Sequence, residues 1–313
     1  MPAVSVIVPS FNHAPFLERR LRSIEAQTYR DFEVLVLDDA STDDSPGLLD
    51  RYARTGLRVD YRTSNSGSPF RQWNRGVGLT TAPLVWIAES DDEADPRLLE
   101  TLVDRLDRSD RCGLAYCQSL CIDADGRIHG TAAQWTADLD PGRWNADYVN
   151  SGRDECARLL AVTNTIPNAS AVVFRREVFA RAGGAPDDMR LAGDWMTWLR
   201  MLLVSDITYT AEPLNRHRSH PETVRARLDG QAGWWRESLA VWRCAQAHLD
   251  LPDETTTRIV DIVREVIARL LPRAVAHPGL LRDLYALGSD LHPRFGRSLA
   301  RLLADRARRR LAR

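Results

Sequence analysis

The sequence predicts an α/β fold with an open sheet, followed by a helical C-terminal region. Over the first hundred residues, short β-branched runs alternate with stretches of helical periodicity, which is the pattern of repeated strand–helix units. After about residue 225 such runs disappear, and three long stretches carry helical periodicity instead. We therefore expect an α/β domain over residues 1–225 and a helical region over residues 226–313.

The first strand–helix–strand unit covers residues 4–39. The runs VSVIVPS and FEVLVLDD are β-branched and end at Pro9 and at two acids, which is typical of strands buried on both faces. Between the two runs, apolar residues recur at helical spacing from Phe16 to Ile24. A helix that joins parallel strands in this way should cross over right-handedly.

Two further units extend the pattern. A capped helix is predicted in STDDSPGLLDRYARTG before the strand LRVDYRT, and a helix in RQWNRGVGLTTA leads into the buried strand of PLVWIAESDD. A helix is expected over residues 97–106, and CGLAYCQSL and ITYTAEPL are predicted as later strands. The stretch 130–150 between these two strands is irregular.

Polar residues follow three of the predicted strands, in PSFNH, LDDAS and ESDD. In open α/β sheets, ligands bind outside the carboxyl ends of the strands, so these clusters should meet at one edge. Glu89, Asp91 and Asp92 would repel one another unless a cation lay among them, and carboxylate oxygens favour hard divalent ions. The alternative is a solvated turn before a helix that begins at Asp95-Pro96.

Composition narrows the classes of partner and location. The net charge of −1 gives no overall attraction for nucleic acid, and no apolar run reaches the about 18 residues needed to span a bilayer. MPAVSVIVPS lacks the basic start and cleavage site of a signal peptide, so we expect a cytoplasmic protein. The five cysteines are odd in number and lack paired spacing, which favours buried thiols over a zinc or disulfide site.

Several motifs, in order, resemble family 2 glycosyltransferases of the GT-A fold. They are VSVIVPSFNHAPFLERRLRSIEAQTYRDFEVLVLDDASTDDS, NSGSPFRQWNRGVGLTTAPLVWIAESDD, PNASAVVFRREVFARAGG, LAGDWMTWLRM and EPLNRHRSHPETV, which together span about residues 3–224. ESDD stands at the DxD metal motif of that family. Many relatives have Asp where this chain has Glu89, which puts the role of Glu89 in doubt. The C-terminal helices lie outside the resemblance.

The resemblance implies a site for a nucleotide-diphosphate sugar, with UDP or dTDP as the nucleotide. Phe11 would be the aromatic platform for the base, and Asp39 would accept the N3–H of uracil or thymine. Arg71 would contact the diphosphate, as a guanidinium suits phosphate oxygens. A core aromatic and a solvated arginine are the alternatives for Phe11 and Arg71. The loop around the nucleoside would be shaped by Pro9, Ser10 and Asn12.

The resemblance also implies a divalent metal, Mn²⁺ or Mg²⁺. Asp92 would be its direct ligand, with Asp91 on ribose or metal and Glu89 in the outer part of the site. His220 occupies a position where relatives often carry a histidine near the diphosphate or metal. A satisfied structural histidine is the alternative for His220.

Asp194 stands where family members carry the catalytic carboxylate that takes the proton of the acceptor hydroxyl. Direct attack with this general base would invert the anomeric configuration. An N-cap for the following helix is an alternative that is compatible with catalysis. Trp195 and Trp198 lie on one helix face, as core or as a wall for a sugar ring. Asn168 belongs to a segment that, with residues 130–150, should shape the pocket for a polysaccharide, lipid-linked or glycoconjugate acceptor.

Two further questions stay open at this point. The last predicted helix carries many arginines beside an apolar side that includes Phe295 and Leu299, so it could lie on an anionic membrane at the inner face, pack on its own domain, or form a homodimer. Trp234 and Trp235 would join one of these interfaces. A Rossmann-type oxidoreductase is disfavoured because PSFNHAPF has no GxGxxG, whereas a catalytically silent nucleotide-sugar binding module or assembly partner remains the alternative function.

Overall fold

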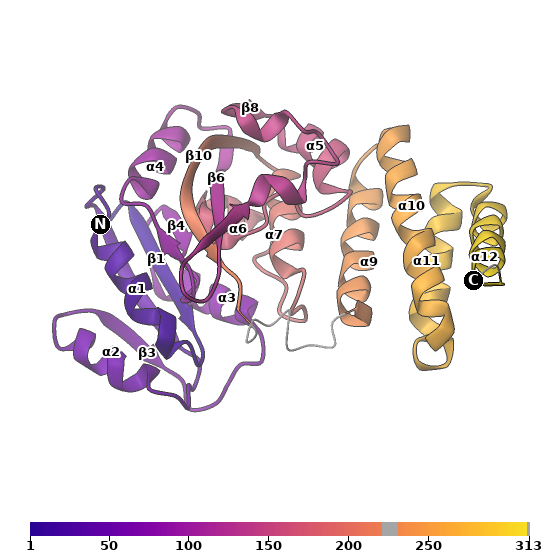
Figure 1. The fold of residues 1–313 in the computed structure, drawn as a ribbon. Helices are drawn as coiled ribbons and strands as arrows, with labels where there is room; N and C mark the ends of the chain where they lie inside the picture. The colour runs from indigo at the N-terminus through magenta and orange to yellow at the C-terminus, as the bar shows by residue number, and fades with distance from the viewer. Residues whose placement is uncertain (221–230, 312–313) are drawn as a thin grey trace.

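The computed structural model describes residues 1–220 and 231–311, which form a mixed sheet with helices on both faces and further helices at one side (Figure 1). The sheet order is β3-β2-β1-β4-β9-β6-β10-β5, with β7 paired to β6 and β8 paired to β10. The strands are β1 (Val4–Ser10), β2 (Phe32–Asp38), β3 (Arg58–Tyr61), β4 (Leu84–Ile87), β5 (Glu93–Ala94), β6 (Cys112–Ile122), β7 (Ile128–Thr131), β8 (Tyr148–Asn150), β9 (Val172–Arg175) and β10 (Asp206–Arg218).

The helices alternate with the strands in the first half of the chain and gather at its end. They are α1 (Ala14–Glu25), α2 (Ser45–Ala53), α3 (Pro69–Leu79), α4 (Leu98–Asp107), α5 (Gly152–Glu155), α6 (Arg176–Arg181), α7 (Gly193–Leu202), α9 (Gln231–His248), α10 (Asp253–Leu270), α11 (Pro278–Leu291) and α12 (Phe295–Leu311). The stretch predicted as irregular, 130–150, contains the end of β7, two short 3₁₀ turns and all of β8. The expected α/β order is therefore confirmed.

The parallel part of the sheet is the part that the sequence predicts best. β1 pairs in parallel with β2 and β4, and β2 pairs in parallel with β3. Every residue of β1 is buried, as expected for a parallel strand with helices on both faces. β9 runs antiparallel between β4 and β6, so the sheet becomes mixed there.

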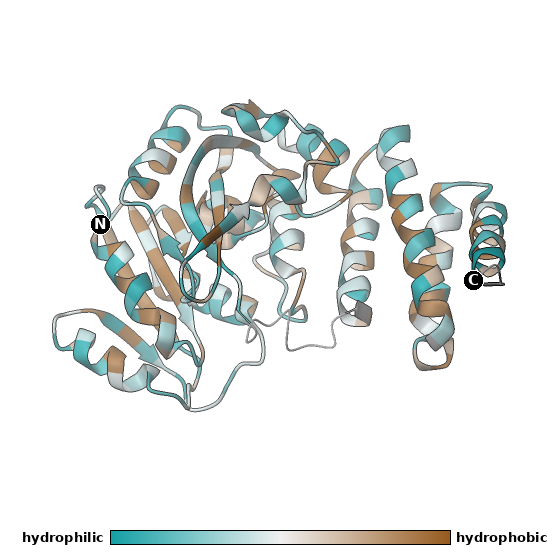
Figure 2. Ribbon diagram, in the orientation of Figure 1, coloured by the Kyte–Doolittle hydropathy of each residue, from teal (hydrophilic) through white to brown (hydrophobic). Residues whose placement is uncertain are grey.

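Two apolar clusters cover the two faces of the sheet. Val6 of β1 packs in one cluster with α1, α2 and α4, whereas its neighbour Ile7 packs in the other with α3 and α7. This alternation follows from the two-residue period of a strand. Figure 2 shows the same pattern, with hydrophobic colour along the inner strands and mixed colour on the surrounding helices.

The C-terminal region is helical, as predicted, and its helices α9 to α12 lie side by side (Figure 1). The expected boundary near residue 225 lies outside the described residues. One buried cluster continues from Trp195 and Trp198 of α7 into Trp242 of α9 and Val263 of α10. In the part of the chain that the structure describes, the helices are too short or too polar to cross a membrane.

Gly76 lets α3 approach the sheet closely. A Cβ atom at this position would overlap Cγ2 of Ile7 and lie 3.1 Å from Cδ1 of Leu37, and both neighbours are buried. We expect Gly76→Ala to lower the free energy of unfolding by about 1–3 kcal/mol because the core would be overpacked. Urea unfolding followed by circular dichroism measures this difference.

Gly78 on the same helix is the matched control. It is exposed, and a Cβ atom there would meet nothing within 4 Å. Gly78→Ala should leave stability unchanged or raise it by about 0.5 kcal/mol, since alanine loses less backbone freedom on folding. Equal effects of the two substitutions would contradict the packing argument.

Candidate active site

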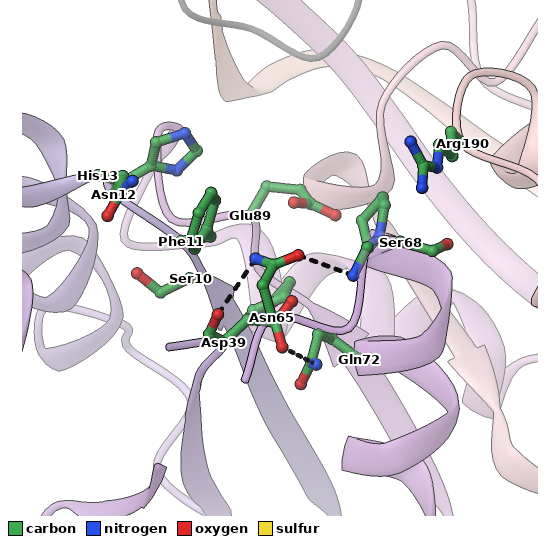
Figure 3. Close-up of a pocket in the computed structure, with 13 residues that line it drawn as sticks. Ser10, Phe11, Asn12, His13, Asp39, Asn65, Ser68, Gln72, Glu89 and Arg190 are labelled. Atoms are coloured by element: carbon green, nitrogen blue, oxygen red, sulfur yellow. Dashed lines mark hydrogen bonds between the residues drawn. The ribbon is translucent and has the colours of Figure 1, made fainter. Parts of the chain in front are cut away.

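Two adjoining cavities lie at the carboxyl ends of β1, β2 and β4. The first cavity has a volume of about 300 Å³ and is lined by residues that include Ser10, Phe11 and Asp39 (Figure 3). The second cavity, also about 300 Å³, is lined by residues that include Asp91 and Asp194. The two cavities share four lining residues, namely His13, Pro69, Glu89 and Arg190. The sequence prediction that three strand ends meet at one edge is confirmed.

The loop after β1 presents an aromatic ring to the first cavity. Phe11 lines that cavity with 37% of its surface exposed, so it is not a core residue. The next residue, Asn12, has a left-handed backbone with φ of 56°, and its side-chain oxygen accepts a hydrogen bond of 2.7 Å from the amide of Thr42. The loops after β1 and β2 are therefore tied together around Phe11. Pro9 and Ser10 line the same cavity.

Asp39 is buried at the end of β2 and holds the loop before α3 in place. Its carboxylate accepts hydrogen bonds from the amide and hydroxyl of Ser66, and one of 2.6 Å from Nε2 of Gln72. The guanidinium of Arg62 lies 3.3 Å away. Asp39 also lines the first cavity, so the residue that holds this loop in place is itself part of the cavity wall.

Arg71, predicted to contact a diphosphate, lies elsewhere. Its guanidinium donates to the carbonyl oxygens of Ser66 and Asp187, and it is not among the residues that line either cavity. Arg190 lines both cavities and is the basic residue that the sequence reasoning missed. Its sequence signal is its position four residues before Asp194.

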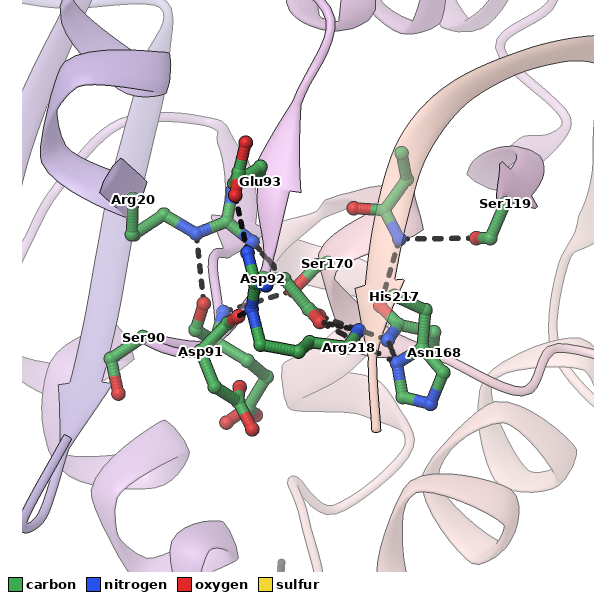
Figure 4. A network of polar contacts seen from close by, with 12 residues as sticks. Arg20, Ser90, Asp91, Asp92, Glu93, Ser119, Asn168, Ser170, His217 and Arg218 are labelled. Carbon is green, nitrogen blue, oxygen red and sulfur yellow. Dashed lines mark hydrogen bonds and ion pairs between the residues drawn. The ribbon is translucent and has the colours of Figure 1, made fainter. Parts of the chain in front are cut away.

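The acids after β4 take different directions. Asp92 is 2% exposed, and its carboxylate accepts hydrogen bonds of 2.9 Å from Nδ2 of Asn168 and 2.8 Å from the amide of Arg218 (Figure 4). His217 lies 3.5 Å and Arg20 4.0 Å from the same carboxylate. Burial opposes ionisation, but His217, Arg20 and the amide of Arg218 outweigh it and hold the pKa of Asp92 well below its usual range.

Asp91 faces the opposite way, toward two histidines. Its carboxylate lies 3.1 Å from Nε2 of His220, whose ring is 5.6 Å from that of His13 in an edge-on arrangement. His13, Asp91 and His220 each offer one ligand atom, and these atoms lie within 4.8 Å of one another. His13 was not predicted as a ligand, although it lies in the polar cluster PSFNH.

This group fits a divalent cation. Nδ1 of His220 is buried and has no hydrogen-bond partner among the described residues, and the carboxylate and imidazoles would supply mixed oxygen and nitrogen ligands. Asp92 is not a member of this group, although it lines the second cavity beside Asp91. Its role as the direct ligand stays a prediction.

Glu89 lines both cavities and accepts a hydrogen bond of 2.9 Å from Nε1 of Trp73. Burial and the nearby charge of Asp91 raise the pKa of Glu89 to about 8, against the opposing effects of Trp73 and Arg20. The residue that departs from the family pattern thus faces the space between the two cavities.

Asp194 lies in the first turn of α7 and lines the second cavity together with Asp91. Its carboxylate accepts a hydrogen bond of 3.0 Å from Nδ2 of Asn164 and one from the amide of Trp195. The N-cap of α7 is Ala192, so Asp194 is a first-turn residue rather than the cap. A carboxylate there is stabilised by the N-terminal end of the helix dipole.

The other residues predicted for the acceptor pocket have mainly structural contacts. Trp198 is completely buried and packs against Trp73 and Phe174, so the core alternative holds for it. Trp195 is 2% exposed, lines neither of the two cavities, and donates to the carbonyl oxygen of Leu160. Asn168 lines the second cavity and contacts His217 as well as Asp92.

Comparison with known proteins gives the family. The model of the family described as Glycosyl transferase family 2 matches residues 5–182. The glycosyltransferase GlyG of Streptococcus pneumoniae serotype 4 is 30% identical over 269 residues, which cover 79% of this chain and 82% of that protein. These matches extend over most of the α/β part of the chain.

Solved structures agree on the fold. TarS of S. aureus in complex with UDP has a TM-score of 0.61 and 17% identity, covering 87% of this chain and 72% of that chain. The mannosyltransferase PcManGT of Pyrobaculum calidifontis, in complex with GDP-Man and Mn²⁺, has a TM-score of 0.59 and 21% identity, covering 99% and 81%. The fold, the cavities at the strand ends and the family match lead to one conclusion: this chain belongs to glycosyl transferase family 2 and is a glycosyltransferase of the GT-A-type fold.

Proposed function

We propose that this protein transfers a sugar from a nucleotide-diphosphate sugar to an acceptor hydroxyl, with inversion at the anomeric carbon. One cavity carries the proposal: Asp194, His13 and Asp91 border it, and it adjoins the cavity around Phe11. His13 and Asp91 also form the group with His220 that could hold a metal ion. A base, a cation site and a nucleoside site are then in the order that the reaction needs.

The first cavity would hold the nucleoside. Phe11 offers an exposed ring for stacking on a base, and Asp39 lies at the cavity wall as a hydrogen-bond acceptor. We assign UDP or dTDP as the donor nucleotide. The UDP complex of TarS supports this assignment, while the GDP-Man complex of PcManGT shows that the same fold accepts a purine nucleotide in that protein.

The diphosphate would lie where the two cavities meet. His13, Asp91 and His220 would hold the divalent cation, which supplies positive charge to the departing phosphate oxygens. Arg190, which lines both cavities, would add a guanidinium contact in place of the predicted Arg71. The two imidazoles move the preference from Mg²⁺ toward Mn²⁺.

The acceptor would enter through the second cavity. Its hydroxyl proton passes to the carboxylate of Asp194, its oxygen bonds to the anomeric carbon, and the bond from that carbon to the diphosphate breaks. Because the attack comes from the side opposite the leaving group, the configuration inverts. Asn164 orients the Asp194 carboxylate through its hydrogen bond.

The acceptor is assigned only as a class: a saccharide, alone, lipid-linked or on another glycoconjugate. α12 packs through Phe295 and Leu299 and leaves Arg297, Arg301 and Arg308 toward its polar side. Such a face would suit an anionic membrane surface that carries a lipid-linked acceptor.

Nucleotide titration with and without metal tests the proposed donor site. We expect one of UDP, dTDP and GDP to bind at least tenfold more tightly with Mn²⁺ than with EDTA, since Asp91 and the two histidines would hold a cation that supplies positive charge for the diphosphate. Isothermal titration calorimetry measures both affinities. Binding of no nucleotide under either condition would refute the donor site.

The two neighbouring acids should respond differently to substitution. Asp91→Ala should remove the Mn²⁺ dependence of nucleotide binding and change the free energy of unfolding by less than about 0.5 kcal/mol, because Asp91 is at the cavity edge. Asp92→Ala should cost about 3–5 kcal/mol of stability, because it leaves buried Arg20 unpaired. Calorimetry and urea unfolding separate the two roles. A stable Asp92→Ala protein that has lost the metal response would support Asp92 as the ligand.

Asp194→Asn tests the general base. The amide keeps the shape of the side chain but cannot accept the proton, so transfer from the bound nucleotide sugar should fall about 10²–10⁴-fold. Affinity for the nucleotide with Mn²⁺ should stay within a factor of two. Release of nucleoside diphosphate, with and without acceptor, measures turnover. Normal turnover by the variant would mean that another group takes the proton.

A further inference from the structure

A third cavity, of about 410 Å³, lies between α7, α9 and α10 and is separate in its lining from the first two. Four tryptophans form much of its wall: Trp195, Trp234, Trp235 and Trp242. The polar lining residues include Ser238, Asp261, Glu265 and Arg269. A cavity of this size with aromatic walls and a few polar groups is typical of a small-ligand site.

The four indole rings form two stacked pairs. Trp195 and Trp234 have ring centres 6.2 Å apart and an interplanar angle of 23°, and Trp235 and Trp242 have 6.3 Å and 23°. Trp195 and Trp242 meet edge to face at 88°, so the pairs form a corner. Trp234 and Trp235 are only partly buried. Flat rings in this arrangement offer faces on which the C–H side of a sugar ring packs well.

One polar atom in this corner has no partner. Nε1 of Trp242 is buried and makes no hydrogen bond to any described residue, although Trp242 is 2% exposed. Trp195, by contrast, donates from its Nε1 to Leu160. A buried N–H without an acceptor costs free energy, and Nε1 of Trp198 in the core is in the same state.

The α10 wall supplies polar groups suited to hydroxyls. Asp261, Glu265 and Arg269 are spaced by four residues and so lie on one side of the helix. Glu265 forms an ion pair with Arg306 of α12, which brings a further guanidinium near this wall. Carboxylates accept and guanidinium groups donate hydrogen bonds, so together they match the mixed donors and acceptors of a saccharide. They are a poor match for a hydrocarbon chain.

Two residues that line the third cavity are next in sequence to Asp194, the proposed general base, and to its partner Asn164. Trp195 lines the third cavity, and its neighbour Asp194 lines the second. Thr163 lines the third cavity, and its neighbour Asn164 holds the Asp194 carboxylate. A ligand in the third cavity would therefore lie beside the residues that position the base.

We propose that the third cavity binds a saccharide unit of the acceptor, other than the unit whose hydroxyl reacts. This inference rests on the proposed function, because it assigns part of the acceptor of the same site. The donor nucleotide binds elsewhere, around Phe11, so the two assignments are tested by different ligands.

The test uses the full chain and a panel of free disaccharides: maltose, cellobiose, lactose, mannobiose and chitobiose. We expect at least one to bind at millimolar concentration, as measured by saturation-transfer NMR and tryptophan fluorescence. Trp235→Ala should weaken that binding at least tenfold. Trp242→Phe replaces one indole of the wall by a smaller ring, and it should weaken binding about three- to tenfold.

Tyr285→Ala is the matched control, since Tyr285 is an exposed aromatic residue of α11 outside the cavity. It should leave disaccharide binding unchanged, and thermal unfolding checks that every variant is folded. Nucleotide affinity with Mn²⁺, measured on the same proteins, should be unaffected by either tryptophan substitution. If the unaltered protein binds disaccharide but no nucleotide, the proposed donor site is refuted and the saccharide assignment of the third cavity is not.

Three results would overturn the saccharide assignment. One is that no disaccharide of the panel binds, and another is that binding survives both tryptophan substitutions in folded protein. The third is that farnesyl phosphate, rather than any disaccharide, changes the fluorescence of the unaltered protein and loses this effect in Trp235→Ala. That outcome would assign the cavity to a lipid chain.

Discussion

The buried ion pair between Arg20 and Asp92 is the constraint on which the site depends. Arg20 of α1 is completely buried, donates to the carbonyl oxygen of Glu89 and the hydroxyl of Ser170, and lies 4.0 Å from Asp92. Asp92 in turn holds the amide of Arg218 at the end of β10. One pair of opposite charges thus joins α1, the turn after β4, the segment before β9 and the end of β10. Removing either charge would leave the other buried without compensation.

This constraint separates the roles of two adjacent acids. Asp92 meets Arg20 and Asp91 meets His220, while both acids line the second cavity. Contacts of Asp92 with Arg20 and of Asp91 with His220 hold the turn after β4, so the Asp91 carboxylate keeps its position without a metal. Preorganised ligands of this kind lower the cost of binding a cation, since the protein has already ordered them.

The sequence predicted the strands and their common edge, because these depend on local periodicity and on the rule that parallel strands end together. The place of Phe11 at the cavity came from the family resemblance and not from periodicity. The resemblance assigned Asp92 as the direct metal ligand, but the sequence did not show that Asp92 meets Arg20, which is distant in sequence. A signal did exist: Arg20 lies on the same stripe of α1 as Leu17, Leu21 and Ile24, all of them buried. The place of Arg190 at both cavities depends on loop geometry, so its nearness to Asp194 in sequence was a weaker signal.

The buried cluster that runs from α7 into α9 and α10 also bears on how such a protein can change over evolution. Trp195 packs against Trp242 directly behind the segment that carries Asp194. Replacing these helices would leave large aromatic surfaces behind the turn that carries Asp194 without neighbours. Substitutions on the facing surfaces of α7, α9 and α10 must therefore be compatible with one another, so these helices can change only together.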